Sequence, residues 1–117
     1  MRKAIVLATI LLAGCVAARP ADDTQVREAV SGYRSCLDRE AAPYRFAEKE
    51  NDTIAEAVVS RCEPYLSAYR VAVVDFLRDS THDGTRAQYE LLMIEPDRRV
   101  ENLREQGKRI VLSTLLD

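Results

Sequence analysis

A run of apolar residues at helical spacing between residues 54 and 76 constrains the fold of this chain most. Its members recur every three or four positions, which places them on one face of an α-helix. Directly before the run, Thr53-Ile-Ala-Glu56 matches a capping box, in which the Thr53 hydroxyl accepts from first-turn amides and Glu56 reaches back. We therefore expect a long amphipathic helix that starts at Thr53. Its apolar stripe comprises Ile54, Val58, Cys62, Tyr65, Tyr69, Val73 and Phe76.

Pro64 lies inside this predicted helix. A proline within a helix removes one backbone hydrogen bond, and its ring clashes with the carbonyl four residues earlier, here that of Ser60. The helix is therefore expected either to kink near Ser60 or to restart with Pro64 in a new first turn.

An earlier helix is predicted to begin at Asp22-Asp23-Thr24 and to run to about Ala41 or Ala42. Carboxylates and a hydroxyl stabilise a helix N-terminus, and Pro43 disfavours helical geometry at Ala42. Residues 43–52 are expected to connect the two helices, with one helical turn at residues 46–49. The stripe of this helix comprises Val26, Val30, Tyr33, Leu37 and Tyr44, with Cys36 on its flank.

A polar stretch at residues 78–84 contains glycine and is predicted to form a turn. Asp83 or Thr85 can cap a third helix after this turn. The apolar residues expected to be buried in that helix are Tyr89, Leu92 and Met93.

Pro96 is expected to interrupt the third helix, and a final helix is predicted from about Asp97. Gly107 is expected to weaken the middle of that helix by up to ~1 kcal/mol. The chain shows no strand-like alternation and no internal repeat. We therefore predict an all-α domain of three or four helices over residues 22–117, with an N-terminal helical hairpin. The apolar positions of the final helix are Val100, Leu103, Ile110, Val111 and Leu115.

The N-terminus has the pattern of a signal peptide. Arg2 and Lys3 are followed by an apolar run of about ten residues and then by small residues. The run is too short for a transmembrane helix, which needs roughly 20 apolar residues. It ends in Leu12-Ala13-Gly14-Cys15, which resembles the lipobox of bacterial lipoproteins.

This resemblance implies that residues 1–14 are removed and that Cys15 becomes an acylated N-terminus. Residues 15–21 then form a short tether between the membrane and the domain. The residue after Cys15 is Val16, whereas an aspartate there marks inner-membrane retention in enterobacterial lipoproteins. The resemblance therefore implies the periplasmic face of the outer membrane. The alternative is a secreted protein that is cleaved near Ala17 and Ala18.

Cys36 and Cys62 are the remaining thiols. In an oxidising periplasm an isolated pair is most simply a structural disulfide. Closing a loop of about 25 residues stabilises a domain by roughly 3.5 kcal/mol in the chain-entropy model. A redox pair favours Cys-x-x-Cys spacing and a metal site needs further ligands, and neither is present. We expect a bridge that joins the first two helices.

Charge and motifs exclude several function classes. Loss of Arg2 and Lys3 lowers the 17 basic residues to 15, against 19 acidic residues, which disfavours nucleic-acid binding. His82 is the sole histidine, and Asp79, His82 and Asp83 are interpreted as turn and cap residues rather than as metal ligands. No nucleophile motif or phosphate loop is present. We therefore expect no catalytic residues, no metal and no cofactor.

Three tyrosines, Tyr33, Tyr65 and Tyr69, lie on the two stripes that are expected to face each other beside the bridge. They are interpreted either as core packing with hydroxyls at the rim or as an aromatic groove for a peptide or ligand. The charged residues expected to flank such a groove are Arg61, Glu63 and Arg70.

Three functions follow as hypotheses. The first is an accessory or assembly subunit of an envelope complex, which resembles in architecture the pilotins of secretion systems, whose domains bind a helix of a secretin subunit in a groove. The second is a periplasmic module that binds a small ligand or peptide between its helices. The third, an enzyme, is the least supported because no catalytic motif is present.

Overall fold

The computed structural model describes residues 22–80 and 84–116. These residues form four α-helices and a 3-10 helix without any strand, which confirms the predicted all-α fold. The predicted leader, Cys15, the tether and His82 lie outside the described residues. The elements are α2 (Thr24–Ala41), η1 (Ala42–Tyr44), α3 (Asn51–Arg61), α4 (Glu63–Ser80) and α5 (Arg86–Leu116).

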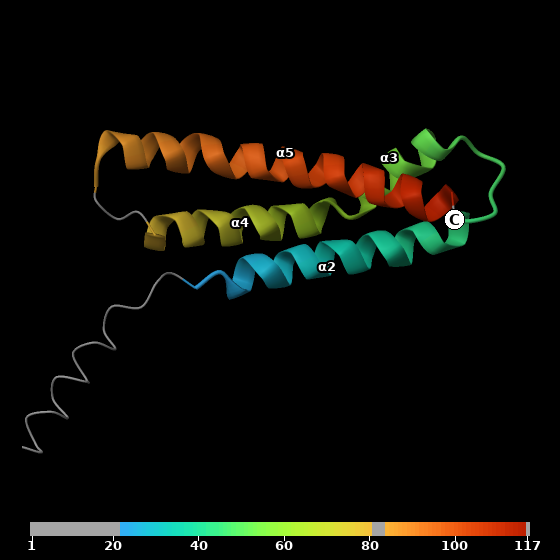
Figure 1. Ribbon diagram of the computed structural model, residues 1–117, viewed down its shortest axis with the longest axis horizontal. Coiled ribbons are helices and arrows are strands. Elements are labelled where there is room, and N and C mark those ends of the chain that lie inside the picture. Colours follow the sequence, from blue (N-terminus) through green and yellow to red (C-terminus); the bar gives the residue numbers. More distant parts are fainter. Residues whose placement is uncertain (1–21, 81–83, 117) are drawn as a thin grey trace, which may run out of the picture.

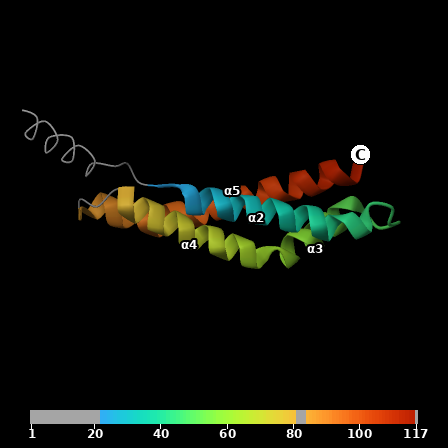
Figure 2. The same cartoon turned by 90° about the horizontal axis from the view of Figure 1, so that it is seen from below.

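The three long helices α2, α4 and α5 lie side by side and form the body of the molecule (Figure 1). Helix α4 runs antiparallel to both α2 and α5, so α2 and α5 run in the same direction. The view from below shows α4 displaced to one side of α2 and α5 (Figure 2). Helix α3 is short and packs against α2 and α5 near the C-terminus. The bundle therefore has α3 and the C-terminus at one end and the start of α2 at the other.

Helix α2 begins and ends close to the predicted positions. The Asp22 carboxylate accepts a hydrogen bond from the Thr24 backbone N–H at 2.9 Å, so Asp22 satisfies one of the free amides of the first turn. The helix ends at Ala41, before Pro43, as expected. The helical turn predicted at residues 46–49 is wrong, because the turn forms earlier, in η1, where Pro43 occupies the first turn.

The long helix predicted from Thr53 is divided in two. It begins at Asn51, and no side-chain hydrogen bond caps it, so the predicted capping box is wrong. The chain leaves helical geometry at Cys62 and restarts in α4, where Pro64 is the second residue. A proline in a first turn loses no helical hydrogen bond, which explains why the break lies here. Of the two alternatives expected at Pro64, a kink or a restart, the structure shows the restart.

Helix α5 continues through Pro96, so the predicted interruption is wrong. The proline is buried against the bundle. On its C-terminal side, two ion pairs hold α5 along α4: Arg70 with Asp97 at 2.8 Å, and Glu63 with Arg104. Continuous packing along α4 offsets the lost backbone hydrogen bond, whose carbonyl partner belongs to Leu92.

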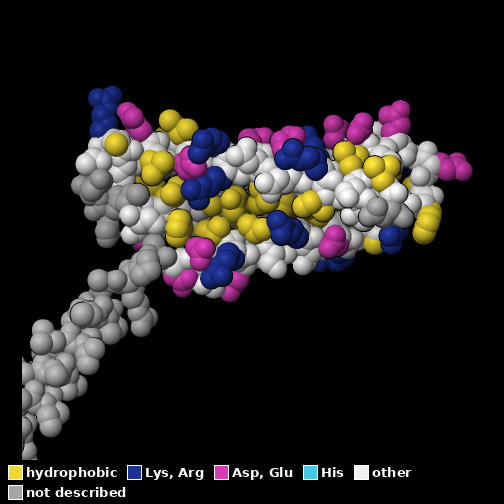
Figure 3. Space-filling model, in the orientation of Figure 1, with side chains coloured by type: hydrophobic (Ala, Val, Ile, Leu, Met, Phe, Trp, Pro, Cys, Tyr) yellow, Lys and Arg dark blue, Asp and Glu magenta, His cyan; other side chains and the backbone are white. Residues whose placement is uncertain are grey.

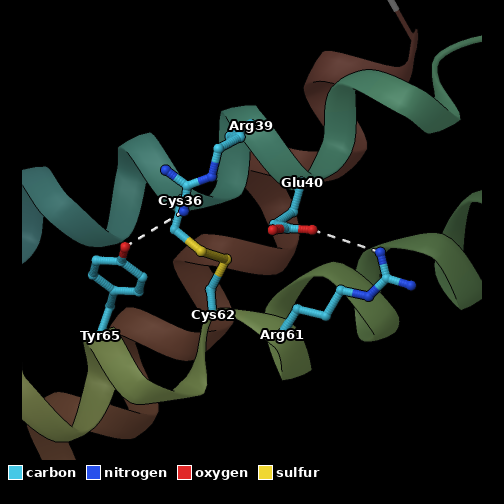
Figure 4. Close-up of a disulfide and its surroundings, with 6 residues drawn as sticks. All are labelled: Cys36, Arg39, Glu40, Arg61, Cys62 and Tyr65. Atoms are coloured by element: carbon cyan, nitrogen blue, oxygen red, sulfur yellow. Dashed lines mark hydrogen bonds and ion pairs between the residues drawn. A yellow bond between two sulfur atoms is a disulfide. The ribbon is translucent and has the colours of Figure 1, made fainter.

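The core lies where α2, α3, α4 and α5 meet. The predicted disulfide between Cys36 and Cys62 is present, with Cα atoms 5.9 Å apart, and it ties α2 to the break between α3 and α4 (Figure 4). Both cysteines are buried in the main apolar cluster. The other buried members of this cluster are Tyr33, Leu37, Ala41, Ile54, Ala55, Val58, Val59, Leu66, Leu103 and Val111.

Candidate partner-binding groove

The structure separates the three tyrosines that the sequence places together. Tyr33 is fully buried, with 0% of its surface exposed, and its ring lies against Gly107 of α5. Burial raises the pKa of the Tyr33 phenol to about 12. Tyr33 is therefore a core residue, in agreement with the packing alternative, and does not line a surface groove. Tyr65 and Tyr69 are half-buried and reach the surface of the bundle.

Tyr65 lies beside the disulfide. Its hydroxyl accepts a hydrogen bond from Arg39 Nη2 at 3.4 Å, and its ring faces Gly32 across the α2–α4 contact (Figure 4). Arg61 belongs to this region too, but it points to Glu40, with 3.5 Å between Nη1 and Oε2. Its guanidinium also lies over the Tyr44 ring, 5.6 Å from the centroid. These contacts join α2 to α3 and α4 and leave Tyr65 and Arg61 with structural partners.

Arg70 and Glu63 lie on the seam between α4 and α5. Arg70 Nε pairs with Asp97 Oδ1 at 2.8 Å, and Glu63 pairs with Arg104, which also pairs with Glu101. This seam encloses a depression of about 240 Å³ in which opposite charges already face each other. Both residues therefore act between α4 and α5, away from Tyr65 and Arg61, and the structure does not bring the predicted flanking charges together.

A groove does form, on the face where α2 and α5 lie in front of α4. Figure 3 shows hydrophobic side chains in a band along this face, with charged side chains on both edges. One depression of about 220 Å³ spans all three helices, and a second of about 420 Å³ continues along α2, with Val30 lining both. We call this surface the α2–α5 groove. Its residues are Val26, Arg27, Val30, Ser31, Arg34, Ser35, Asp38, Tyr69, Arg99, Asn102, Leu103 and Gln106.

The floor of the α2–α5 groove is apolar and comes from three helices. Val26 and Val30 of α2, Tyr69 of α4 and Leu103 of α5 supply it. Burial raises the pKa of the Tyr69 phenol, while nearby Arg99 lowers it, so the phenol remains neutral near pH 7. The floor therefore offers hydrocarbon and one phenol ring, with no charged group of its own.

The rim of the groove carries three arginines, Arg27, Arg34 and Arg99, and one carboxylate, Asp38. Arg27 pairs with Asp23 at 3.1 Å, and Arg99 pairs with Glu95 at 3.0 Å, so these two guanidiniums already have carboxylate partners. Arg34 is exposed, and it belongs to none of the ion pairs formed within residues 22–80 and 84–116. Asn102 and Gln106 add amides on the α5 side. The rim can therefore hydrogen-bond to polar groups and can accept one carboxylate at Arg34.

The sequence left open whether Tyr69 packs in the core or lines a groove, and it did not indicate the other residues of the groove. Val26 and Val30 were assigned to the core stripe of the first helix, and both are only half-buried. Leu103 was assigned to the core of the last helix and is buried, but one edge lines the groove. The sequence around Arg34 did not indicate a groove residue. Whether Arg34 forms an ion pair depends on which side chains the other helices bring near it.

Neither a metal site nor a membrane-spanning helix is present in the part of the chain that the structure describes. No three His, Cys, Asp or Glu side chains there are arranged to hold a metal ion. None of the described helices is both long and apolar enough to cross a bilayer. Comparison with known proteins finds no family model, no curated protein and no solved structure that matches this chain.

Proposed function

We propose that this protein is a lipid-anchored interaction subunit of the bacterial cell envelope that binds a helical segment of a partner in the α2–α5 groove. The observation that supports this function best is the groove itself, an apolar strip that remains open to solvent along three helices. A protein-binding module exposes such a strip, whereas a small-ligand carrier encloses its cavity and an enzyme gathers titratable groups.

The lining of the groove suggests the chemistry of the partner. An amphipathic helix lays a stripe of apolar side chains into a groove of this kind, with contacts every three or four residues. Val30, Tyr69 and Leu103 offer a continuous apolar surface for that stripe. Arg34 at the rim favours an aspartate or glutamate beside the stripe. The proposed partner is therefore an amphipathic helix with an acidic flank.

The proposed location rests on the N-terminal sequence. Leu12-Ala13-Gly14-Cys15 resembles a lipobox, and Val16 follows the cysteine, which favours the periplasmic face of the outer membrane. The disulfide between Cys36 and Cys62 is consistent with an oxidising compartment. More than one acyl chain on Cys15 gives stable anchoring, because each buried methylene contributes ~0.8 kcal/mol.

Replacing Cys15 by serine is expected to release the protein from the membrane fraction. Serine cannot carry the thioether-linked lipid, so both acylation and the lipoprotein-specific cleavage are lost. The measurement is fractionation of cell envelopes followed by intact mass determination. Wild-type protein of mature mass without added acyl groups, or a serine variant that is processed and sediments as the wild type does, contradicts the anchor.

The groove is tested by reversing the charge of Arg34. The Arg34→Glu protein, purified from crosslinked envelopes, is expected to retain its partner about tenfold less than the wild type, a loss of ~1.4 kcal/mol. Arg45→Glu is the matched control, because it makes the same charge change at an exposed residue that does not line the groove. Equal loss of the partner in both variants, or in neither, argues against recognition at the groove.

A further inference from the structure

Among residues 22–80 and 84–116, no third helix covers the end of the α4–α5 hairpin as α2 covers the rest of it. Tyr33 meets Gly107, and Val30 shares a depression with Leu103. Along the bundle axis, a residue of α2 therefore lies level with the residue of α5 whose number is about 73 higher. The first residue of α2 therefore lies level with about residue 97 of α5. Helix α5 begins at Arg86, so its first turns extend about 15 Å beyond α2.

We call this uncovered end, formed by residues 74–80 of α4 and residues 86–95 of α5, the hairpin tip. It carries three of the most exposed large apolar side chains of the described chain: Tyr89 at 65%, Met93 at 58% and Ile94 at 65%. Tyr89 and Met93 were predicted to be buried, and that prediction is wrong, because no third helix packs on them at this level. Half-buried apolar side chains at the tip are Val74, Phe76, Leu91 and Leu92.

One turn of α5 at the tip, residues 91–94, is apolar on every side. Leu91, Leu92, Met93 and Ile94 are consecutive, and four consecutive residues go once around a helix with 3.6 residues per turn. One partner helix, α4, can cover only one side. A helix segment that is apolar all round normally lies in a protein core or in lipid.

The hairpin tip lies at the end of the bundle where the chain enters α2. Figure 1 places the start of α2 and the tip together, opposite α3 and the C-terminus. Asp22 lines the same depression as Asp79 in the last turn of α4. Residues 15–21 span at most about 25 Å when fully extended. A lipid on Cys15 therefore keeps Asp22, at the base of the tip, within about 25 Å of the membrane surface.

We propose that the hairpin tip inserts its apolar side chains into the interfacial region of the lipid bilayer to which Cys15 is anchored. This inference rests on the proposed acylation of Cys15. The tip then orients the bundle, with α3 and Phe46 directed away from the membrane and the α2–α5 groove facing sideways. Tyrosine suits this depth, because its ring lies in hydrocarbon while its hydroxyl reaches water.

The charges of the tip indicate that hydrophobic contact, not anionic lipid, drives this insertion. Arg78 and Arg86 are accompanied by four carboxylates, so the tip has no excess of basic residues. These are Asp75, Asp79, Glu90 and Glu95. Arg86 already pairs with Glu90 at 3.3 Å. Insertion is therefore expected to occur in zwitterionic bilayers and to gain nothing from anionic lipid.

Tryptophan fluorescence tests the insertion, because the chain contains no tryptophan of its own. Tyr89→Trp places a reporter at the tip, and Phe46→Trp places one at the other end of the bundle, where Phe46 is 94% exposed. Each lipidated protein is reconstituted into phosphatidylcholine vesicles with bromine atoms on the acyl chains. On reconstitution into these vesicles, the emission maximum of the Tyr89→Trp protein is expected to shift to shorter wavelength and its intensity to fall about twofold. The emission maximum and intensity of the Phe46→Trp protein are expected to stay unchanged.

Each other outcome overturns the inference. Emission from the tip reporter that resembles emission from the Phe46→Trp protein means that the tip lies in water. A blue-shifted but unquenched tip reporter means that protein covers the tip, and with purified protein the cover is a second copy of the chain. Met93→Trp repeats the measurement if Tyr89→Trp lowers the melting temperature. An intact mass taken before reconstitution separates this failure from failure of the anchor, because a chain without acyl groups removes the premise of both proposals.

Discussion

Replacing Cys36 and Cys62 together by alanine is expected to lower the free energy of unfolding by about 3 kcal/mol or more. The bridge closes a loop with a sequence separation of 26, which restricts the unfolded chain. Alanine also leaves a space in the core, because both cysteines are buried. For a domain of this size, such a loss is a large share of the total stability.

Thermal and denaturant unfolding measure this effect. The double variant is expected to melt roughly 15 °C below the wild type under oxidising conditions. Wild-type protein treated with a reductant is the control, and its melting temperature is expected to fall toward that of the variant. Melting of the variant at the wild-type temperature would show that the bridge contributes little.

Replacing Gly107 by alanine is expected to destabilise the protein, although the same change at an exposed helical site is stabilising. Alanine in a helix interior is favoured over glycine by about 1 kcal/mol. At Gly107, however, an added Cβ would lie 2.9 Å from Tyr33 Cζ and 3.1 Å from Tyr33 Cε2, and closer still to the hydroxyl. Tyr33 is fully buried and cannot move aside, so overpacking of about 1–3 kcal/mol outweighs the helix preference.

Two variants make this prediction specific. Gly32→Ala is the matched control, because its Cβ would meet only the half-buried Tyr65 ring, at 3.3 Å, and that ring can shift. Tyr33→Phe removes the atom closest to the added methyl group. It should cost little by itself, because the Tyr33 hydroxyl has no hydrogen-bond partner among the described residues. Gly107→Ala in the Tyr33→Phe background is therefore expected to lose less stability than in the wild type. A Gly107→Ala protein that is more stable than the wild type would contradict the tight contact.

Helical periodicity predicted the fold class, and the isolated pair of cysteines in an expected oxidising compartment predicted the disulfide. The spacing of Tyr33, Cys36 and Leu37 puts them on one face of a helix, and all three are buried. The restart at Pro64 followed from the missing N–H of proline. The helical stripes and the restart depend on residues close together in sequence, which is why they could be predicted from the sequence.

Features that depend on distant residues were predicted poorly. Pro96 was expected to end a helix, but packing along α4 keeps α5 continuous. Gly107 was interpreted as a weak point of that helix, whereas it provides room for Tyr33 of α2. Tyr89 and Met93 are exposed because α2 starts level with about residue 97 of α5 and does not reach them. The relative position of two helices along the bundle cannot be read from the local apolar pattern.

The groove residues illustrate the same limit. Tyr69 and Leu103 lie on core stripes, and each shows an edge to solvent only because α2 and α5 diverge in front of α4. Arg61 and Arg70 were expected beside the tyrosines, but Glu40 and Asp97 draw them to other contacts. A binding surface formed from three helices therefore required the three-dimensional arrangement.

A photo-crosslinking amino acid at position 30 tests partner binding in the groove most directly. Val30 lies at the junction of the two depressions, and Val71 of α4 is the control, because it is 60% exposed and does not line the groove. Irradiation of living cells is expected to give one covalent adduct with an envelope protein from position 30, none from position 71, and much less when Arg34→Glu is also present. Equal adducts from both positions, or no adduct from position 30 in cells that contain the lipidated protein, would contradict the proposed function.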